Sequence, residues 1–179
     1  MSREAIQTIV ERYSTEFHIV SDFSCGNASL DDYIRIHQER DENDHTAVTF
    51  VLVDREATSS PKPIIGYFTL NSFTLPRLQA RRRDRDKYLG RYDPVPAVLI
   101  GRLALDARFQ GRGLGNTLLL AAFMKVLRIR DEIGIAVVVV HAIDEAAAAF
   151  YQHHGFTQFR DEPFHFYYPL ATLESGLNQ

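Results

Sequence analysis

The spacing of apolar residues along the chain predicts strands and helices in alternation. Apolar, β-branched runs predict strands at Ile6–Tyr13, Ala47–Val53, Ile64–Leu70, Val98–Asp106, Ile135–Ala142, Phe156–Phe159 and Phe164–Leu170. Apolar residues three or four positions apart predict a helix that starts at Leu114 and ends near Asp131, and a shorter helix over Glu145–His153. Residues Phe23–Tyr33 are typical of a turn that runs into a helix.

Polar residues and glycines at the ends of these segments fit the roles of helix caps. Asn27 or Ser29 can cap the first helix, and Asp144 can cap the helix that begins at Glu145. Gly155 then falls where a C′ glycine is expected. The apolar stripe of the first helix is expected to contain Leu30, Tyr33, Ile34 and His37.

The order of the elements predicts a mixed α/β sheet in a single domain over residues 1–179. The runs at 47–53 and 64–70 predict an antiparallel hairpin. Further along, strand, helix and strand follow one another, which predicts one right-handed crossover between parallel strands. The run at Ile135–Ala142 is nearly all β-branched, as expected for a strand buried on both faces. A long connection at residues 76–96 is expected to be functional or to contain a short helix of its own.

The composition fits one folded domain without disulfide or metal staples. Of the 179 residues, 45% are hydrophobic, which is ordinary for a globular chain. Cys25 is the one cysteine, so an internal disulfide is excluded, and its expected role is inert packing. His141, His153 and His154 are expected to be structural or exposed, because no third ligand has the spacing of a metal site. Because a signal peptide and a membrane-length apolar run are both missing, we expect a cytoplasmic protein.

Charge is distributed unevenly along the chain. A formal net charge of −3 and a sequence pI near 6.1 argue against a protein that is basic throughout, as many nucleic-acid binders are. Residues 77–91 nevertheless hold seven basic and two acidic residues, a local net charge of +5. Such a segment can grip a polyanion, although a solvated charged loop has the same composition. The candidate substrate-binding residues are Arg81, Arg82, Arg83, Arg85 and Lys87.

A glycine-rich turn, Gln110–Gly115, joins the central predicted strand to the long predicted helix. Its three glycines allow positive φ and close approach of another molecule to the backbone. Free N–H groups of the turn and of the helix start favour an anion, and phosphate suits them best. Neither the Gly-Lys-Ser/Thr of a Walker loop nor G-x-G-x-x-G is present. Tight packing of the strand against the helix is the alternative reason for such a turn.

The spacing Gln110-x-x-Gly113-x-Gly115 resembles the acetyl-CoA pyrophosphate loop of the GNAT family of N-acetyltransferases. Residues 148–156 are similar to a second signature of that family, A-x-x-F-Y-x-x-x-G-F. The resemblance implies antiparallel strands one to four, parallel fourth and fifth strands that splay apart around the pantetheine arm, and helices on both faces. It also implies that acetyl-CoA (coenzyme A) is held by Leu103, Ala104, Leu105, Gln110, Gly111, Arg112, Gly113, Leu114, Gly115 and Asn116.

A narrower likeness is to the GNAT toxins of bacterial toxin–antitoxin pairs. It rests on Phe23-x-Cys-Gly-Asn-x-x-Leu-Asp-x-Tyr33, Gly66-Tyr-Phe, Gly101-Arg-Leu-Ala-Leu-Asp106 and Val140-His-Ala-Ile-Asp144. Such toxins acetylate the α-amine of aminoacyl-tRNA and are neutralised by a ribbon-helix-helix antitoxin. They tend to be basic, whereas this chain is mildly acidic. A small amine or a protein amine therefore stays open as the acceptor. A catalytically silent acyl-CoA-binding module stays open as an alternative function. The sequence also leaves open whether the chain forms a homodimer.

Tyr151 is the candidate general acid of acetyl transfer. A phenol with a pKa of ~10 can protonate a thiolate whose conjugate acid has a pKa of ~8.5 and still be neutral at pH 7. A half-buried tyrosine on an amphipathic helix is the alternative reading. No carboxylate stands out as a general base, which favours an α-amine acceptor, because a pKa of ~7.7 to 8.0 leaves such an amine partly neutral without help.

Overall fold

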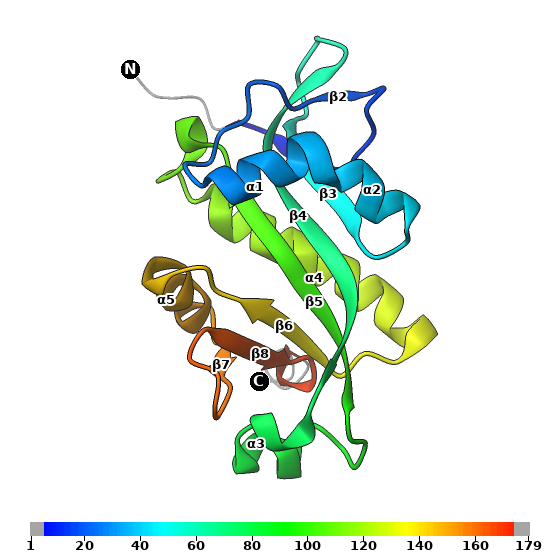
Figure 1. The fold of residues 1–179 in the computed structure, drawn as a ribbon, viewed down its shortest axis with the longest axis vertical. Coiled ribbons are helices and arrows are strands. Elements are labelled where there is room, and N and C mark those ends of the chain that lie inside the picture. Colours follow the sequence, from blue (N-terminus) through cyan, green and yellow to red (C-terminus); the bar gives the residue numbers. More distant parts are fainter. Residues whose placement is uncertain (1–5, 174–179) are drawn as a thin grey trace. The chain divides into compact units, whose positions relative to one another are not determined.

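The computed structural model describes residues 6–173 (Figure 1). These residues group into two compact units, of which the first holds 6–70 and 102–122 and the second holds 71–101 and 123–173. Three elements belong to both units: β4 (Lys62–Leu75), β5 (Val95–Leu105) and α4 (Leu114–Ile133). The single domain over residues 1–179 stays a prediction.

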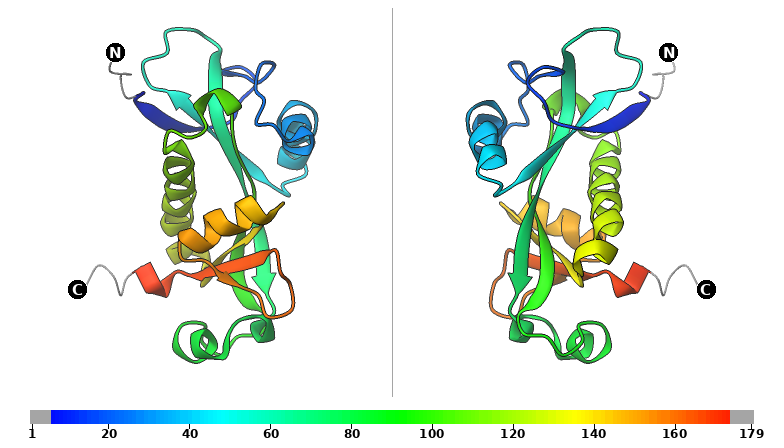
Figure 2. Two further views of the ribbon diagram at one scale, coloured as in Figure 1. Left: turned by 90° about the vertical axis from the view of Figure 1, so that its left-hand side faces the viewer. Right: turned by 90° about the vertical axis from the view of Figure 1, so that its right-hand side faces the viewer.

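The first unit is built on an antiparallel sheet. Strand β3 (Val48–Asp54) pairs with β1 (Thr8–Arg12) on one side and with β4 on the other, as the hairpin pattern predicts. A short strand, β2 (His18–Ile19), pairs in parallel with Lys62 and Pro63. Figure 2 shows α1 (Ala28–Asp32) and α2 (Gln38–Asn43) on one face of this sheet and the first turns of α4 on the other. The core between sheet and helices contains Phe23, Tyr33, Ile34, Val51, Val53, Ile64, Tyr67 and Ala104.

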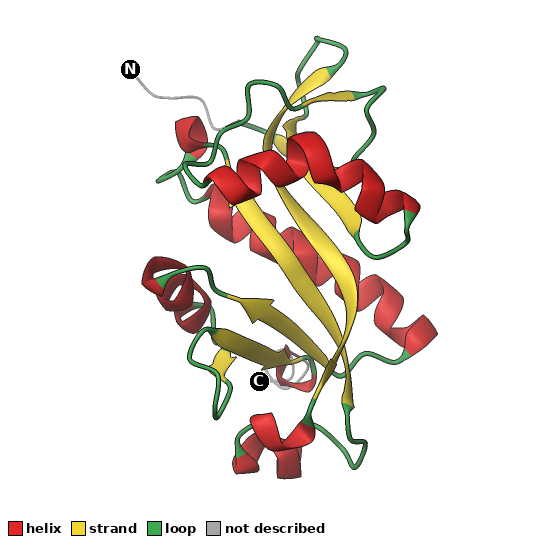
Figure 3. Ribbon diagram, viewed as in Figure 1, coloured by secondary structure: helices red, strands yellow, loops and turns green. Residues whose placement is uncertain are grey.

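The second unit contains the parallel strand pair. Ala97–Ile100 of β5 align with Val137–Val140 of β6 (Val137–His141), and β6 pairs antiparallel with β8 (His165–Pro169). Strand β7 (Thr157–Gln158) closes that edge by pairing with β8. Besides the end of α4, this unit contains α3 (Arg82–Lys87) and α5 (Glu145–His153), which are among the helices drawn in red in Figure 3. The apolar core contains Leu75, Ala80, Leu89, Val95, Ala97, Val137, Val139, Phe159 and Tyr167.

The mixed sheet predicted from the sequence is confirmed. The fourth and fifth strands that the GNAT resemblance implies correspond to β5 and β6, because the short strand β2 raises the number of each later strand by one. Their paired residues end at Ile100 and Val140, whereas β5 continues to Leu105. The side chains of Val137–Val140 are fully buried, as their apolar run predicts.

The predicted helix caps are largely confirmed. The side chain of Asn27 accepts a hydrogen bond from the backbone N–H of Leu30 at 3.2 Å, and that of Asp144 accepts one from Ala147 at 2.8 Å. Gly155 has a positive φ of 84°, as a residue that reverses the chain after a helix requires.

The first helical run is longer than its pattern predicts. After α1 the chain makes one π-helical turn, Tyr33–His37, before α2 begins. A π turn shifts the faces of the helix, and this shift leaves Tyr33 and Ile34 buried but His37 exposed. The prediction that His37 belongs to the apolar stripe is therefore wrong.

Candidate active site

The glycine-rich turn of the first unit presents backbone rather than side chains. Gly111 and Gly113 have φ values of +71° and +78°, and a Cβ on either residue would have no heavy atom of residues 6–173 within 4 Å apart from those of its own residue and its chain neighbours. Helix α4 begins at Leu114, within the segment Gln110–Gly115, and the first N–H groups of a helix have no acceptor inside it. Open space, exposed backbone and a helix start together form a site that suits an anion.

Side chains on both sides hold the turn in place. The side-chain nitrogen of Gln110 donates to the carbonyl oxygens of Cys25 and Leu105, each at 2.9 Å. Arg108 binds Asp106 through two nitrogens at 2.8 Å, and the Asp106 carboxylate also accepts a hydrogen bond from the Ser24 N–H. Burial alone would raise the pKa of Asp106, but these hydrogen bonds lower it below the ordinary value. Gln110 thus has a bracing role that its sequence motif does not reveal.

The remaining predicted cofactor residues of this unit lie before and after Gln110 in the chain. Ala104 is buried, whereas Leu103 and Leu105 are partly exposed at the end of β5. Arg112 is exposed, with its guanidinium carbon 5.4 Å from the ring centre of Phe109. Strands β5 and β4 approach closely at this point. A Cβ on Gly66 of β4 would lie only 2.8 Å from the carbonyl oxygen of Ala104 in β5. This contact gives the Gly66-Tyr-Phe motif a packing reason.

Tyr151 belongs to the second unit, on helix α5. Its side chain is 6% exposed, and its ring lies 5.4 Å from each of the rings of Phe150 and Phe156. Burial raises the pKa of the Tyr151 phenol above the ordinary value of ~10. The phenol is therefore protonated at neutral pH, which is the form that a general acid needs.

The basic segment also lies in the second unit, and only part of it faces solvent. Arg81, Arg82, Arg83 and Lys87 are exposed, whereas Arg85 is half-buried. One guanidinium nitrogen of Arg85, Nη1, is fully buried and has no hydrogen-bond partner among residues 6–173. Arg77 likewise turns inward and donates to the carbonyl oxygens of Arg85 and Gly90. The exposed cations of the segment are thus those on and beside α3, together with Arg91 at its end.

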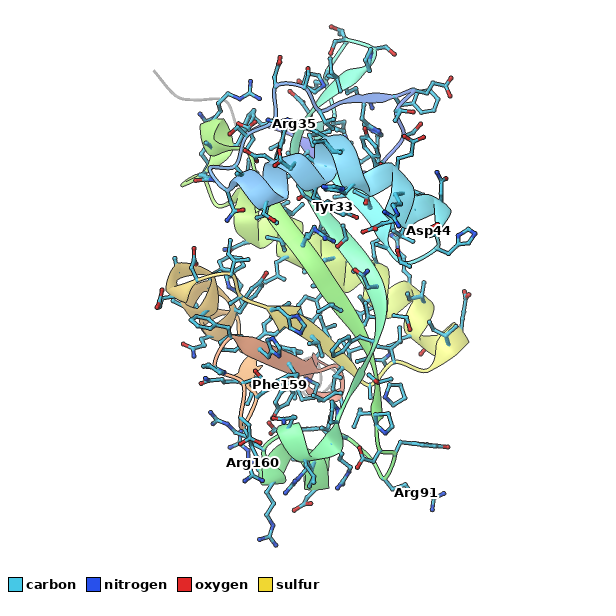
Figure 4. The ribbon with its side chains drawn as sticks, in the orientation of Figure 1. Tyr33, Arg35, Asp44, Arg91, Phe159 and Arg160 are labelled. Atoms are coloured by element: carbon cyan, nitrogen blue, oxygen red, sulfur yellow. The ribbon has the colours of Figure 1, made fainter. Side chains whose placement is uncertain are left out.

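Two contacts that are distant in sequence fix the orientation of α3. The Tyr167 hydroxyl donates to the buried Asp84 carboxylate at 2.6 Å and accepts a hydrogen bond from the Arg81 N–H at 2.9 Å. The N–H of Arg160 donates to the Gln79 carbonyl at 3.0 Å, which brings Arg160 to the turn that precedes α3 (Figure 4). Arg160 is exposed and adds a positive charge that the local sequence pattern misses.

Neither the cysteine nor the histidines form a reactive cluster. Burial, with the Asp31 carboxylate beside it, raises the pKa of the Cys25 thiol to about 11. The rings of His141 and His165 are stacked with centres 3.8 Å apart, and burial followed by the charge of His165 lowers the pKa of His141 to about 4. Within residues 6–173, no group of three or more His, Cys, Asp or Glu side chains could hold a metal ion, and no helix is long and apolar enough to cross a membrane.

The chain is similar in sequence and in fold to known acetyltransferases. Residues 78–158 match the model of the acetyltransferase (GNAT) domain. A protein of Mycobacterium tuberculosis described as a tRNA-acetylating toxin is 35% identical over 146 residues, which cover 82% of each chain. A tyrosine-to-phenylalanine mutant of KacT superposes with a TM-score of 0.85 at 27% identity, over 94% of this chain and 98% of that one. AtaT complexed with acetyl-methionyl-tRNAfMet shares the fold, with a TM-score of 0.85 at 24% identity over 96% of this chain and 99% of the other.

Proposed function

Because the chain belongs to the GNAT acetyltransferase family, we propose that it transfers the acetyl group of acetyl-CoA to the α-amine of aminoacyl-tRNA, as a toxin-type enzyme. The observation that carries this proposal is the 35% identity, over 82% of both chains, to a relative described as a tRNA-acetylating toxin. The same kinship supports a ribbon-helix-helix antitoxin as partner. The reaction belongs in the cytoplasm, where aminoacyl-tRNA and acetyl-CoA are found together.

The first unit offers a fitting site for acetyl-CoA. The open backbone of Gly111–Gly113 and the start of α4 suit the pyrophosphate, and exposed Arg112 can add a charged contact to it. Leu103–Leu105, at the end of β5, offer backbone groups to the pantetheine arm and to the thioester. When it is bound, acetyl-CoA supplies an activated acetyl carbonyl.

Acetyl transfer forms one C–N bond and breaks one C–S bond. The attacking amine must be neutral, and an aminoacyl α-amine with a pKa of ~7.7 to 8.0 is partly neutral without a dedicated base. We assign the polarisation of the acetyl carbonyl to a backbone N–H at Leu103–Leu105. The amine loses one proton and the leaving thiolate gains one, which we assign to the Tyr151 hydroxyl. The phenol is then reprotonated, with the proton of the amine as its net source.

The exposed cations around α3 supply the contact to the tRNA backbone. Arg81, Arg82, Arg83 and Lys87 present their charges to solvent, and Arg160 lies beside the same segment. Cations of this kind bind phosphates regardless of base sequence and position a nucleic acid without reading it. The net negative charge of the whole chain does not oppose this, because the positive residues are concentrated in one segment.

Transfer of labelled acetyl from acetyl-CoA to bulk aminoacylated tRNA tests the proposal. Deacylated tRNA and free amino acids serve as controls in the same buffer. We expect label on aminoacyl-tRNA alone. Label on a free amine or on a protein, or no transfer despite binding of acetyl-CoA by calorimetry, would contradict the proposed acceptor. Failure to bind acetyl-CoA would contradict the assignment of the glycine-rich turn.

The role of the basic segment is tested separately by charge reversal. Changing Arg81, Arg82 and Arg83 together to Glu should abolish acetylation of tRNA and leave the affinity for acetyl-CoA unchanged. The control changes Arg55 and Arg128, two exposed arginines outside this segment, to Glu and should keep activity. Equal activity of the triple variant and the control would remove the tRNA contact from this segment.

A further inference from the structure

Arg102, on β5 in the first unit, has an unusual set of neighbours. Its guanidinium carbon lies 3.5 Å from the ring centre of Tyr33, which is a stacked cation–π contact. Its one charged neighbour among residues 6–173 is Asp41, whose carboxylate oxygen lies 3.8 Å from Nη1. That separation is longer than a hydrogen bond. The face of the Arg102 guanidinium therefore stacks on Tyr33, whereas its five N–H donors, which lie along the edge of the group, donate to no described residue.

The stacking partner of Arg102, Tyr33, is buried in the packed core of the first unit. Tyr33 is 2% exposed and packs in the core between the helical run and the sheet, with its ring 6.1 Å from that of Tyr67 (Figure 4). The Arg102 side chain is 34% exposed. A guanidinium fixed against a buried ring loses little further freedom when its edge binds a ligand. Arg102 is thus prepared for an anion that arrives from solvent.

Burial leaves the stacking partner of Arg102 neutral. The Tyr33 hydroxyl is fully buried, and burial raises the pKa of Tyr33, with the Thr49 hydroxyl and the Arg102 charge acting in the opposite direction. The ring therefore stays uncharged at neutral pH and presents its face to the guanidinium. The exposed edge of Arg102 is the part of this cluster that an anion from solvent can reach.

The position of Arg102 in the chain connects this anion site to the reaction. It directly precedes Leu103, and neighbouring Cα atoms are about 3.8 Å apart. Because side chains alternate along a strand, Arg102 and Leu103 point to opposite faces of the sheet. The contact with Tyr33 places Arg102 on the face covered by α1 and α2, whereas the glycine-rich turn leads to α4 on the other face. An acceptor can approach Arg102 without crossing the proposed site of the pyrophosphate.

We propose that Arg102 is an acceptor-binding residue whose guanidinium binds the phosphodiester nearest to the aminoacyl end of the tRNA, an inference that rests on the proposed function. In aminoacyl-tRNA the carboxyl group of the amino acid is esterified and carries no charge. The anion nearest to the reacting amine is therefore the phosphate on the 5′ side of the terminal adenosine. The planar fork of a guanidinium matches two phosphate oxygens.

Kinetics of Arg102→Gln test this assignment. Loss of a charge-assisted contact should raise the KM for aminoacyl-tRNA about 10- to 100-fold, with kcat and the affinity for acetyl-CoA largely kept. Arg102→Lys, which keeps the charge but not the planar fork, should give a smaller rise. The control is Arg12→Gln, which removes an exposed arginine that pairs with Glu42 and should leave KM unchanged. An unchanged KM in Arg102→Gln overturns the inference.

A pair of competitors separates a phosphate contact from a general disturbance of the site. The probes are amide analogues of aminoacyl-adenosine with and without a 5′ phosphate, used as inhibitors of tRNA acetylation. The unchanged protein should be inhibited at least about tenfold better by the phosphorylated analogue, and Arg102→Gln should not distinguish the two. Equal inhibition of the unchanged protein, or a preference that survives in Arg102→Gln, overturns the inference. Absence of tRNA acetylation by the unchanged protein would instead overturn the proposed function, and this inference with it.

Discussion

Replacement of Gly66 by Ala should destabilise the first unit through a contact with backbone. The added Cβ would lie 2.8 Å from the Ala104 carbonyl oxygen, and it would also approach side-chain carbons of Leu105 at 3.1 Å and Leu118 at 3.3 Å. The oxygen is part of β5 and cannot swing away as a flexible side chain can. Forcing an extra carbon into a packed core costs about 1–3 kcal/mol. The smaller entropy of the unfolded alanine chain offsets only about 0.4–1 kcal/mol of this.

The expected net loss is therefore about 1–2 kcal/mol of the free energy of unfolding. Urea denaturation measures it as a lower midpoint with an unchanged slope. Because the Ala104 carbonyl must move, the affinity for acetyl-CoA should also fall, which calorimetry can follow. Gly134→Ala is the matched control: its φ of +61° makes alanine unfavourable by about 1–2 kcal/mol, but no heavy atom lies within 4 Å of its Cβ position. A Gly66→Ala variant as stable as the unchanged protein, or one with full cofactor affinity, would refute the reasoning.

Three further predictions concern single side chains of the second unit. Tyr151→Phe should lower kcat about 100-fold or more without weakening the binding of acetyl-CoA, because general acid catalysis contributes factors of that size; full turnover would exclude Tyr151 as the acid. His141 has a pKa of about 4 when folded and about 6.5 when unfolded, so its contribution to stability is complete above pH 6.5 and is lost as the pH falls towards 4. Urea midpoints of His141→Gln should therefore depend less on pH in this range, and an identical acid slope would contradict the assignment. Tyr167→Phe leaves the buried Asp84 carboxylate without its hydroxyl donor, so amide hydrogens of α3 should exchange faster, whereas unaltered exchange would mean that other contacts hold this helix.

Local pattern was sufficient to predict most of the elements. The hairpin of β3 and β4, the crossover from β5 through α4 to β6, and the caps at Asn27 and Asp144 all follow from residues close together in sequence. What the pattern missed depends on partners far along the chain. Strand β2 is two residues long and exists because Lys62 and Pro63 lie beside it. The π turn at Tyr33–His37 likewise has no signal in apolar spacing.

For the candidate site, too, features set by neighbouring residues could be predicted, whereas features set by contacts distant in sequence could not. The glycine-rich turn and the exposed arginines of α3 could be identified from sequence. The inward orientation of Arg77 and Arg85 could not, because it depends on the carbonyl groups that the folded segment presents to Arg77 and on the burial of Arg85. Arg102 lies inside the Gly101–Asp106 motif, and its stacking on Tyr33, which depends on the fold, distinguishes it from a solvated arginine.

The elevated pKa of Cys25 has a consequence for the redox chemistry of the protein. Alkylating reagents and peroxides attack thiolates, and a pKa of about 11 leaves roughly two orders of magnitude less thiolate at neutral pH than an ordinary cysteine has. The thiol is thus protected by its burial and by the neighbouring Asp31 carboxylate. Its pKa returns to the ordinary value when that setting opens. The single thiol therefore serves as an intrinsic reporter, unreactive while the first unit is folded and reactive once it unfolds.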